Sequence, residues 1–300
     1  PKHRDTFYFF SNKGVKEFTS FNAAVSIYQR QLKREFKDGN FSADSLKTYE
    51  SRIRNIQNYI TDKGITDFSC HKFNNAFVYD YLEYLRYTKE VTARTRDNYF
   101  TFIVTLSGWL QQKKYIAENP CIGISKIHKR KNEKIIITKA VREQIFNYYE
   151  EKDYSFLIFC MCCYYCLIRR TELSKIKVSD VDLKNSTLWI SAEDSKNNKS
   201  AFVTIPPIFA TYLSKHIALS KKTDFLFSED NYAPGPLKFN PNKATGNWSR
   251  MRLKLKINVK IKWYYLKDTG IVDLITAGVP LNSVRDQARH HSISQTNDYI

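Results

Sequence analysis

The stretch that most restricts the fold of this 300-residue chain lies at its C-terminal end and reads Arg289-His290-His291-Ser292-Ile293-Ser294-Gln295-Thr296-Asn297-Asp298-Tyr299-Ile300. It places His290 nine positions (299 − 290) before Tyr299. If a short helix starts at Ser294, Tyr299 lies on it and His290 sits in the preceding turn, so both can face one phosphate. A phenolate is a good nucleophile, and its phosphodiester conserves the energy of the bond it breaks. The pair therefore predicts covalent cleavage of DNA, provided that the chain also supplies cations.

The composition supplies cations in excess. The formal net charge is +18 and the isoelectric point is near 9.5, which predicts a polyanionic partner, nucleic acid first. An anionic membrane surface is the alternative, but no segment approaches the ~20 apolar residues of a spanning helix. We therefore expect no membrane association. The polar start, Pro1 to Asp5, is not typical of a secretory signal and predicts a reducing, cytoplasmic location.

The cysteines are expected to be buried apolar residues. Cys160, Cys162, Cys163 and Cys166 cluster in an apolar run, whereas Cys70 and Cys121 stand alone. Metal binding by the cluster is conceivable, but helical spacing turns these side chains in several directions. We expect no metal site and favour small hydrophobic packing, the usual state of a free cysteine.

The first part of the chain is expected to form four helices, because apolar residues recur at three- and four-residue spacing. The predicted helices are Phe21–Phe36, Ser45–Ile60, Asn74–Tyr87 and Thr92–Tyr115. The polar run from Lys126 to Lys134 then predicts an interdomain linker over 126–137. That linker is either a solvated connector or a basic segment that binds a DNA backbone.

The second part is expected to be helical with a small antiparallel sheet. Strand-like runs cover Thr187–Ser191 and Ala201–Ile205, and a loop rich in Pro, Gly and Asn covers Asn231–Gly246. The predicted helices are Lys139–Tyr149, Tyr154–Leu167, one opening near Thr171, Ile208–Leu219, Asn247–Leu255, Leu266–Ala277 and Asn282–Arg289. The fold class is therefore mainly α (α+β).

Two adjacent arginines occur where a buried helix gives way to the next, in Leu167-Ile168-Arg169-Arg170-Thr171-Glu172-Leu173. Alone, they could be a solvated surface pair. Together with Asp180-Val181-Asp182 downstream, however, the segment resembles the first conserved box of the tyrosine recombinases, the phage-type and conjugative-transposon integrases. That box reads roughly Gly-Leu-Arg-x-Ser/Thr-Glu-Leu. Arg169 matches the catalytic arginine of the family, Arg170 does not, and Leu167 replaces the glycine.

The next resemblance concerns a hairpin lysine that precedes a Val-Pro or Ile-Pro pair. Ser195-Lys196-Asn197-Asn198-Lys199, ahead of Thr204-Ile205-Pro206, is similar to it. Lys196 is the match and Lys199 the alternative, and an ordinary solvated loop lysine is the other interpretation. A flexible lysine suits this role because it can protonate a departing 5′ oxygen.

The second box of the family, His-x-Leu-Arg-His-Thr, is matched in spacing but not in residues. Here it reads Tyr264-Tyr265-Leu266-Lys267-Asp268-Thr269, with Lys267 lying 23 residues (290 − 267) before His290. Lysine keeps the charge of the family's arginine but loses the bidentate fork. Tyr264 stands where the family has histidine or lysine, and its phenol could hydrogen-bond a phosphate oxygen.

The last box, Leu-Gly-His-x-Ser-Ile-x-Thr-Thr before the tyrosine, is similar to the segment from Ala288 to Tyr299. Arg289 replaces the glycine, whereas His290 and Tyr299 keep their places. Without the other boxes, His290 could be a capping or core histidine and Tyr299 an ordinary tyrosine. The boxes follow one another in the order of the family, which favours the resemblance.

The resemblance implies a division into an N-terminal arm remnant (1–20), a four-helix core-DNA-binding domain (21–125), the linker (126–137) and the catalytic domain (138–300). The catalytic domain would be shortened after Tyr299, and the nucleophile near that end would be poorly placed. The two domains would clamp duplex DNA. The residues expected to bind DNA outside the catalytic centre are Arg94, Arg96, Lys126, Lys129, Arg130 and Lys131.

The implied activity is site-specific recombination without metal, cofactor or ATP. Tyr299 would form a 3′-phosphotyrosyl bond, Lys196 would protonate the leaving 5′ oxygen, and Glu172 would orient Arg169. Arg169, Lys267 and His290, with Tyr264 as a weaker candidate, would stabilise the transition state. The protein would be a monomer in solution and a homotetramer on DNA, with an accessory DNA-bending protein, in the bacterial nucleoid. The alternatives are DNA relaxation of the type IB topoisomerase kind and a DNA-binding relative with impaired cleavage.

Overall fold

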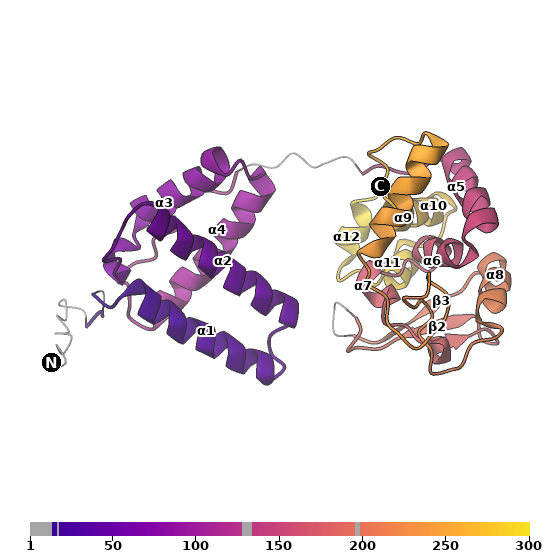
Figure 1. The fold of residues 1–300 in the computed structure, drawn as a ribbon, viewed down its shortest axis with the longest axis horizontal. Coiled ribbons are helices and arrows are strands. Elements are labelled where there is room, and N and C mark those ends of the chain that lie inside the picture. The colour runs from indigo at the N-terminus through magenta and orange to yellow at the C-terminus, as the bar shows by residue number, and fades with distance from the viewer. Residues whose placement is uncertain (1–13, 17, 128–133, 196–198) are drawn as a thin grey trace. The chain divides into compact units, whose positions relative to one another are not determined.

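The computed structural model describes residues 14–16, 18–127, 134–195 and 199–300. The chain divides into two compact units, Pro1–Lys131 and Asn132–Ile300, and the division falls inside the expected linker, 126–137. Each unit has its own hydrophobic core. The prediction of a mainly helical chain with a small antiparallel sheet is confirmed (Figure 1).

The first unit contains the four predicted helices, with ends shifted by a few residues. They are α1 (Phe21–Lys37), α2 (Ala43–Asp62), α3 (Asn75–Glu83) and α4 (Ala93–Gln112), with short turns at Cys70–Lys72 and Tyr84–Thr88. Their starts follow the usual capping chemistry, since the side chains of Ser42, Asn74 and Thr92 each accept a backbone N–H three residues on. Helix α2 packs against α1 and α4, and α3 packs against α4.

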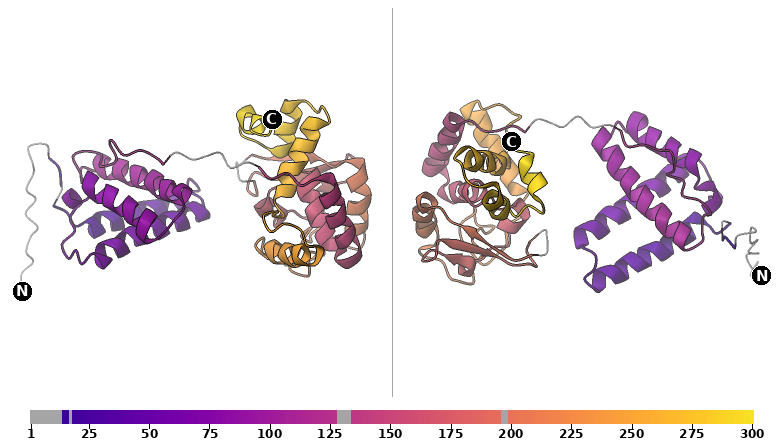
Figure 2. Two further views of the ribbon diagram at one scale, coloured as in Figure 1. Left: turned by 90° about the horizontal axis from the view of Figure 1, so that it is seen from above. Right: turned by 180° about the vertical axis from the view of Figure 1, so that it is seen from behind.

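The second unit is also mostly helical and is seen from further sides in Figure 2. Its helices are α5 (Lys139–Lys152), α6 (Tyr154–Tyr165), α7 (Arg170–Leu173), α8 (Pro207–Ile217), α9 (Lys243–Leu255), α10 (Tyr265–Thr276), α11 (Leu281–Ala288) and α12 (Ile293–Asn297). Helix α6 is the centre of this unit, because α5, α8 and α10 all pack against it.

The sheet of the second unit is antiparallel in the order β1 (Val181–Asp182), β2 (Thr187–Ile190) and β3 (Ala201–Thr204). The predicted hairpin is present as β2 and β3, with Leu188 opposite Val203 and both side chains buried. Strand β1, which has only two residues, was not predicted, because two residues carry no alternating pattern.

Several predicted boundaries in the second unit are wrong. Helix α9 starts at Lys243, inside the segment predicted as a loop, and α6 ends at Tyr165 instead of Leu167. Leu167 cannot continue the helix, because its φ of 51° lies in the left-handed region. Helix α12 starts at Ile293 and ends at Asn297, so Tyr299 follows the helix and does not lie on it.

The predicted burial of the cysteines is confirmed. All six are buried free thiols, and burial raises the pKa of Cys160, Cys162 and Cys163 above the usual range. Among the residues that the structure describes, no three His, Cys, Asp or Glu side chains form a group that could hold a metal ion. In the same part of the chain no helix combines the length and apolar character needed to cross a membrane.

Candidate active site

The site is built around Arg169, the first predicted catalytic residue. Arg169 is the N-terminal cap of α7, and its backbone N–H donates to Glu172 Oε2 at 2.9 Å. Its guanidinium Nη1 donates to Glu172 Oε1 at 3.0 Å. The carboxylate of Glu172 therefore fixes both the main chain and the side chain of Arg169. The contact suits the orienting role expected for Glu172, which itself stays a prediction.

A second arginine, Arg289, holds the same carboxylate. Its Nη2 pairs with Glu172 Oε2, while Arg169 Nη2 donates to the Arg289 carbonyl at 2.5 Å. Glu172 has no exposed side-chain surface. Burial alone would raise the pKa of this carboxyl, but Arg289 and Arg169 outweigh burial and hold the pKa of Glu172 below its usual range. Glu172 is therefore a buried anion shared between two cations.

Lys267 lies beside this cluster on α10, with only 4% of its surface exposed. Its ammonium group donates to the carbonyl of Leu167 and, at 3.3 Å, to the carbonyl of Ala288. Burial is the main cause that lowers the pKa of Lys267 to about 7, and the charges of Arg289 and Arg169 lower it further. Lys267 is therefore only partly protonated near neutral pH.

Two turns carry these residues, and both contain a non-glycine residue with positive φ. Leu167 has φ 51° and lies two positions before Arg169, and Arg289 has φ 52° at the C-terminal cap of α11. These are the two positions at which the family pattern has glycine, the residue that adopts this region at least cost. Each side chain costs about 1 kcal/mol in backbone energy there, so the backbone of the site persists although its glycines are replaced.

His290 follows the second turn and is half-buried. Its Nδ1 lies 3.0 Å from the hydroxyl of Thr296, which is fully buried. Burial, followed by the charges of Lys267 and Arg169, lowers the pKa of His290 to about 4. The imidazole is therefore neutral near pH 7, and if Thr296 donates to Nδ1, the ring hydrogen is on Nε2 and available to a ligand.

Tyr299 is held by three neighbours. Its hydroxyl donates to Asp268 Oδ1 at 2.6 Å, its ring stacks on His290 at 5.9 Å, and Lys134 Nζ lies 2.9 Å from the ring centroid. Burial first, and then the hydrogen bond to Asp268, raise the pKa of Tyr299. The ring of Tyr299 is thus held beside His290 and its hydroxyl is bonded to a carboxylate; the expectation that Tyr299 is poorly placed for attack stays a prediction.

Tyr264 stands at the N-terminal cap of α10, where the structure gives it a half-buried position. Burial raises the pKa of its phenol, and the charge of Arg169 acts in the opposite direction. The proposed contact of Tyr264 with a phosphate stays a prediction.

The other predicted residues divide into three groups. Arg94, Lys126 and Lys199 are exposed, as a DNA contact requires. Lys196, Lys129, Arg130 and Lys131 lie outside the described residues. Arg96 is a correction: it is 7% exposed, and its guanidinium binds Asp97 at 3.2 Å and the Ser125 carbonyl at 2.9 Å, so it fastens the end of unit 1 instead of facing DNA.

Sequence reasoning missed Arg289, Asp268 and Lys134 as members of the site. Arg289 was noted only as a replaced glycine, and Asp268 and Lys134 approach Tyr299 from positions 31 and 165 residues away in sequence (299 − 268 and 299 − 134). The one signal in the sequence was the exchange of a glycine for a charged residue directly before His290.

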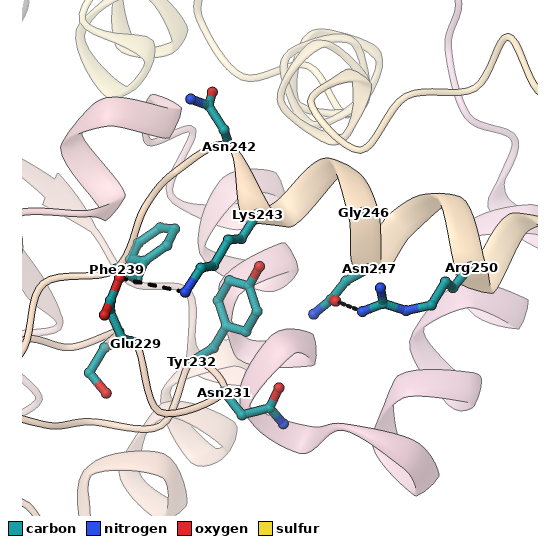
Figure 3. Close-up of a pocket in the computed structure, with 10 residues that line it drawn as sticks. Glu229, Asn231, Tyr232, Phe239, Asn242, Lys243, Gly246, Asn247 and Arg250 are labelled. Carbon is teal, nitrogen blue, oxygen red and sulfur yellow. Dashed lines mark hydrogen bonds and ion pairs between the residues drawn. The ribbon is translucent and has the colours of Figure 1, made fainter.

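A separate cavity of about 590 Å³ lies between α9 and the loop before it (Figure 3). Its lining includes Tyr232, Arg250 and an ion pair between Lys243 and Glu229 at 3.5 Å. Its lining contains none of the residues grouped around Arg169, namely Glu172, Lys267 and Arg289. The cavity is therefore not the candidate active site.

Comparisons with known proteins find the same family that the sequence boxes resemble. Residues 136–300 match the model of the phage integrase family. A tyrosine recombinase of Pseudothermotoga lettingae is 24% identical over 196 residues, which are 64% of this chain and 65% of the relative, so the match spans just under two thirds of that protein.

Two solved structures share the fold. The Tn1549 transposon integrase, in complex with circular intermediate DNA, is 13% identical with a TM-score of 0.75, covering 92% of this chain and 94% of that one. A lambda integrase tetramer bound to a Holliday junction is 12% identical with a TM-score of 0.71, covering 98% of this chain and 84% of that one. At these identities the likeness concerns the fold.

Proposed function

Because the chain belongs to the phage integrase family, we propose that it is a site-specific DNA recombinase that cleaves and rejoins duplex DNA through a 3′-phosphotyrosyl bond at Tyr299. The reaction uses neither metal nor ATP. The observation that supports this proposal most directly is the gathering of Arg169, Lys267, His290 and Tyr299, taken from separate boxes of the sequence, around one buried carboxylate and its neighbours.

The proposed chemistry is phosphoryl transfer to Tyr299. The phenol of Tyr299 gives its proton to Asp268, the carboxylate to which it donates a hydrogen bond, and the resulting phenolate attacks the scissile phosphorus. The bond from phosphorus to the 5′ oxygen breaks, and Lys196 supplies the proton that this oxygen needs. Arg169 and the neutral His290 donate hydrogen bonds to the oxygens of the pentacoordinate transition state. Attack by the 5′-hydroxyl of a partner strand then reverses the step and releases Tyr299.

The proposed partner is duplex DNA, bound as a homotetramer during strand exchange. The net charge of +18 supports a polyanionic partner, and the lambda integrase of the same fold forms a tetramer on a Holliday junction. Exposed Arg94 and Lys126, together with Lys129, Arg130 and Lys131 of the linker, would contact the phosphate backbone. A DNA-bending accessory protein and action in the bacterial cytoplasm, on the nucleoid, belong to the same proposal.

One observation favours a second candidate, a DNA-binding relative in which cleavage is impaired. Lys267 replaces the arginine of the second box, and its ammonium group binds two backbone carbonyls inside the unit. A lysine held in this way offers less to a phosphate than a guanidinium fork. The two candidates differ in whether any covalent adduct forms.

The experiment begins by finding the target. The protein is incubated with a library of random duplexes that carry a nick, and DNA linked covalently to protein is isolated under denaturing conditions and sequenced. The recovered site is then rebuilt as a nicked suicide substrate, from which the short cleaved fragment escapes. We expect the unchanged protein to accumulate adduct and Tyr299→Phe to bind the same DNA but form none.

Two controls make the result decisive. Thermal unfolding of Tyr299→Phe checks that loss of the hydrogen bond to Asp268 leaves the unit folded. Tyr265→Phe removes a hydroxyl from another half-buried tyrosine, at the start of α10, and is the matched control. Adduct in Tyr299→Phe would remove Tyr299 from the mechanism. Absence of adduct with every library member would favour the impaired relative.

A further inference from the structure

Two residues in this chain depart from the family pattern in opposite directions. Position 267 has lysine where the pattern has arginine, and position 289 has arginine where the pattern has glycine. The chain thus loses one guanidinium and gains another. The structure brings the two positions together, since Lys267 donates a hydrogen bond to Ala288, the residue directly before Arg289.

The ammonium group of Lys267 is occupied by the main chain. It donates to the carbonyls of Leu167 and Ala288, and each of these residues lies next to or within one of the two left-handed turns. Lys267 therefore ties the turn that precedes Arg169 to the turn that carries Arg289. This is the work of a positioning residue, because the ammonium group of Lys267 bonds two backbone carbonyls that belong to different turns.

Arg289 occupies the place beside Arg169. The two guanidiniums bind different oxygens of Glu172, Arg169 through Oε1 and Arg289 through Oε2. Their side chains are enclosed to a similar degree, with 13% and 5% of the surface exposed. A guanidinium has five N–H donors in one plane, so it can hold a carboxylate on one edge and approach a phosphate oxygen with another.

The charge balance of the cluster also calls for an anion. Arg169 and Arg289 share the single buried carboxylate of Glu172, and the partly titrating Lys267 adds to the excess of positive charge. That excess is the reason the pKa of the adjacent His290 is lowered beyond the effect of burial. A phosphate bound between Arg169 and His290 would balance it.

We propose that Arg289 supplies the second guanidinium for the scissile phosphate, in place of the arginine missing from position 267, and that Lys267 positions the two turns on which Arg169 and Arg289 stand. This inference rests on the proposed function, because it assigns a further cation to the same reaction. Arg289 thereby becomes a catalytic residue, and the replaced glycine is a compensation for the altered second box.

The test measures single-turnover adduct formation on the nicked suicide substrate at saturating protein. Arg289→Gly restores the family residue and relieves the positive φ, and we expect the rate to fall about 10²-fold, the usual effect of losing one transition-state donor. Arg289→Gln keeps a planar donor for Glu172 without the charge, and we expect a fall of the same order. DNA binding should change less than the rate.

A matched control removes the same kind of residue from an unrelated turn. Lys256 is an exposed cation with φ 53° at the C-terminal cap of α9, so Lys256→Gly makes the same change of backbone and charge away from the cluster. We expect it to cleave at the unchanged rate. Thermal unfolding of all variants separates loss of fold from loss of chemistry.

The decisive readout is cross-rescue. In Lys267→Arg combined with Arg289→Gly, the guanidinium returns to the position of the family pattern, and we expect the rate to recover at least tenfold over Arg289→Gly. An unchanged rate in Arg289→Gly or Arg289→Gln, or no recovery in the double variant, would overturn the role of Arg289. Absence of adduct in the unchanged protein would instead refute the proposed function, so the two failures are distinguishable.

Discussion

Lys267 carries an ammonium group into the interior of the second unit, and this makes stability depend on pH. Its pKa is lowered to about 7 in the folded protein, mainly by burial, whereas an unfolded lysine titrates near pH ~10.4. Between these values the unfolded chain binds the proton more tightly than the folded one. The free energy of unfolding therefore rises with pH across this window, by up to about 1.4 kcal/mol per pH unit.

The prediction is checked with Lys267→Met, which has a similar length and no charge. Denaturant unfolding of both proteins is measured from about pH 7 to pH 10. We expect the unchanged protein to gain stability relative to Lys267→Met as pH rises, because only the former sheds a buried charge. Two parallel curves would show that Lys267 keeps an ordinary pKa.

The proximity of three candidate site residues was predictable from sequence. The boxes predict that Arg169, His290 and Tyr299 lie close together, and the structure brings their elements together. Arg289 and Asp268 were not predicted. Their roles depend on which side chain of another element they meet, and no local pattern contains that information.

The left-handed turns show why the replaced glycines do not disrupt the site. Leu167 has a positive φ and yet is fully buried, so its packing against Ile271 and Val284 in a small cluster offsets the backbone cost. A buried leucine side chain contributes about 1.5–3 kcal/mol, more than the roughly 1 kcal/mol of the turn. The sequence alone reveals the backbone cost of replacing glycine with leucine, but not the burial of the Leu167 side chain that offsets it.

At the scale of elements, the contact between α6 and α10 depends on one glycine. A Cβ added at Gly270 would overlap the carbonyl oxygen of Tyr164 and lie 2.8 Å from Leu167 Cδ2. The first of these is backbone and cannot move without shifting α6. Gly270→Ala should therefore destabilise the second unit by roughly 3 kcal/mol, the upper part of the range for overpacking, measured by denaturant unfolding.

Gly108 is the matched control for this prediction. It also lies in a helix interior, in α4, but a Cβ there meets nothing within 4 Å. Gly108→Ala should stabilise the first unit by about 0.5–1 kcal/mol, because alanine loses less backbone entropy in a helix. Equal effects of the two substitutions would mean that the close approach of α6 and α10 does not limit the fold.

The long helices were predictable from their apolar period, whereas the short elements show no such period. Helices such as α1 and α4 have several turns of apolar spacing and begin at recognisable signals. By contrast, α7 and β1 have four and two residues, too few to show a period. Such short elements form because capping and tertiary contacts fix them, as Glu172 does for α7.

At the scale of the whole molecule, the division into two units followed from composition. The basic run from Lys126 to Lys134 is too charged to bury, and the boundary of the compact units falls within it. The excess of positive charge is consistent with the proposed DNA partner, since a polyanion attracts a chain of this net charge.

The chemical identity of the protein–DNA bond decides whether Tyr299 is the nucleophile. Adduct from the suicide substrate is digested with nuclease and protease, and the peptide that retains a nucleotide is sequenced by mass spectrometry. We expect one modified peptide, with Tyr299 joined to the 3′-phosphate and a free 5′-hydroxyl on the released strand. A modified residue other than Tyr299, or a bond to the 5′ end, would contradict it.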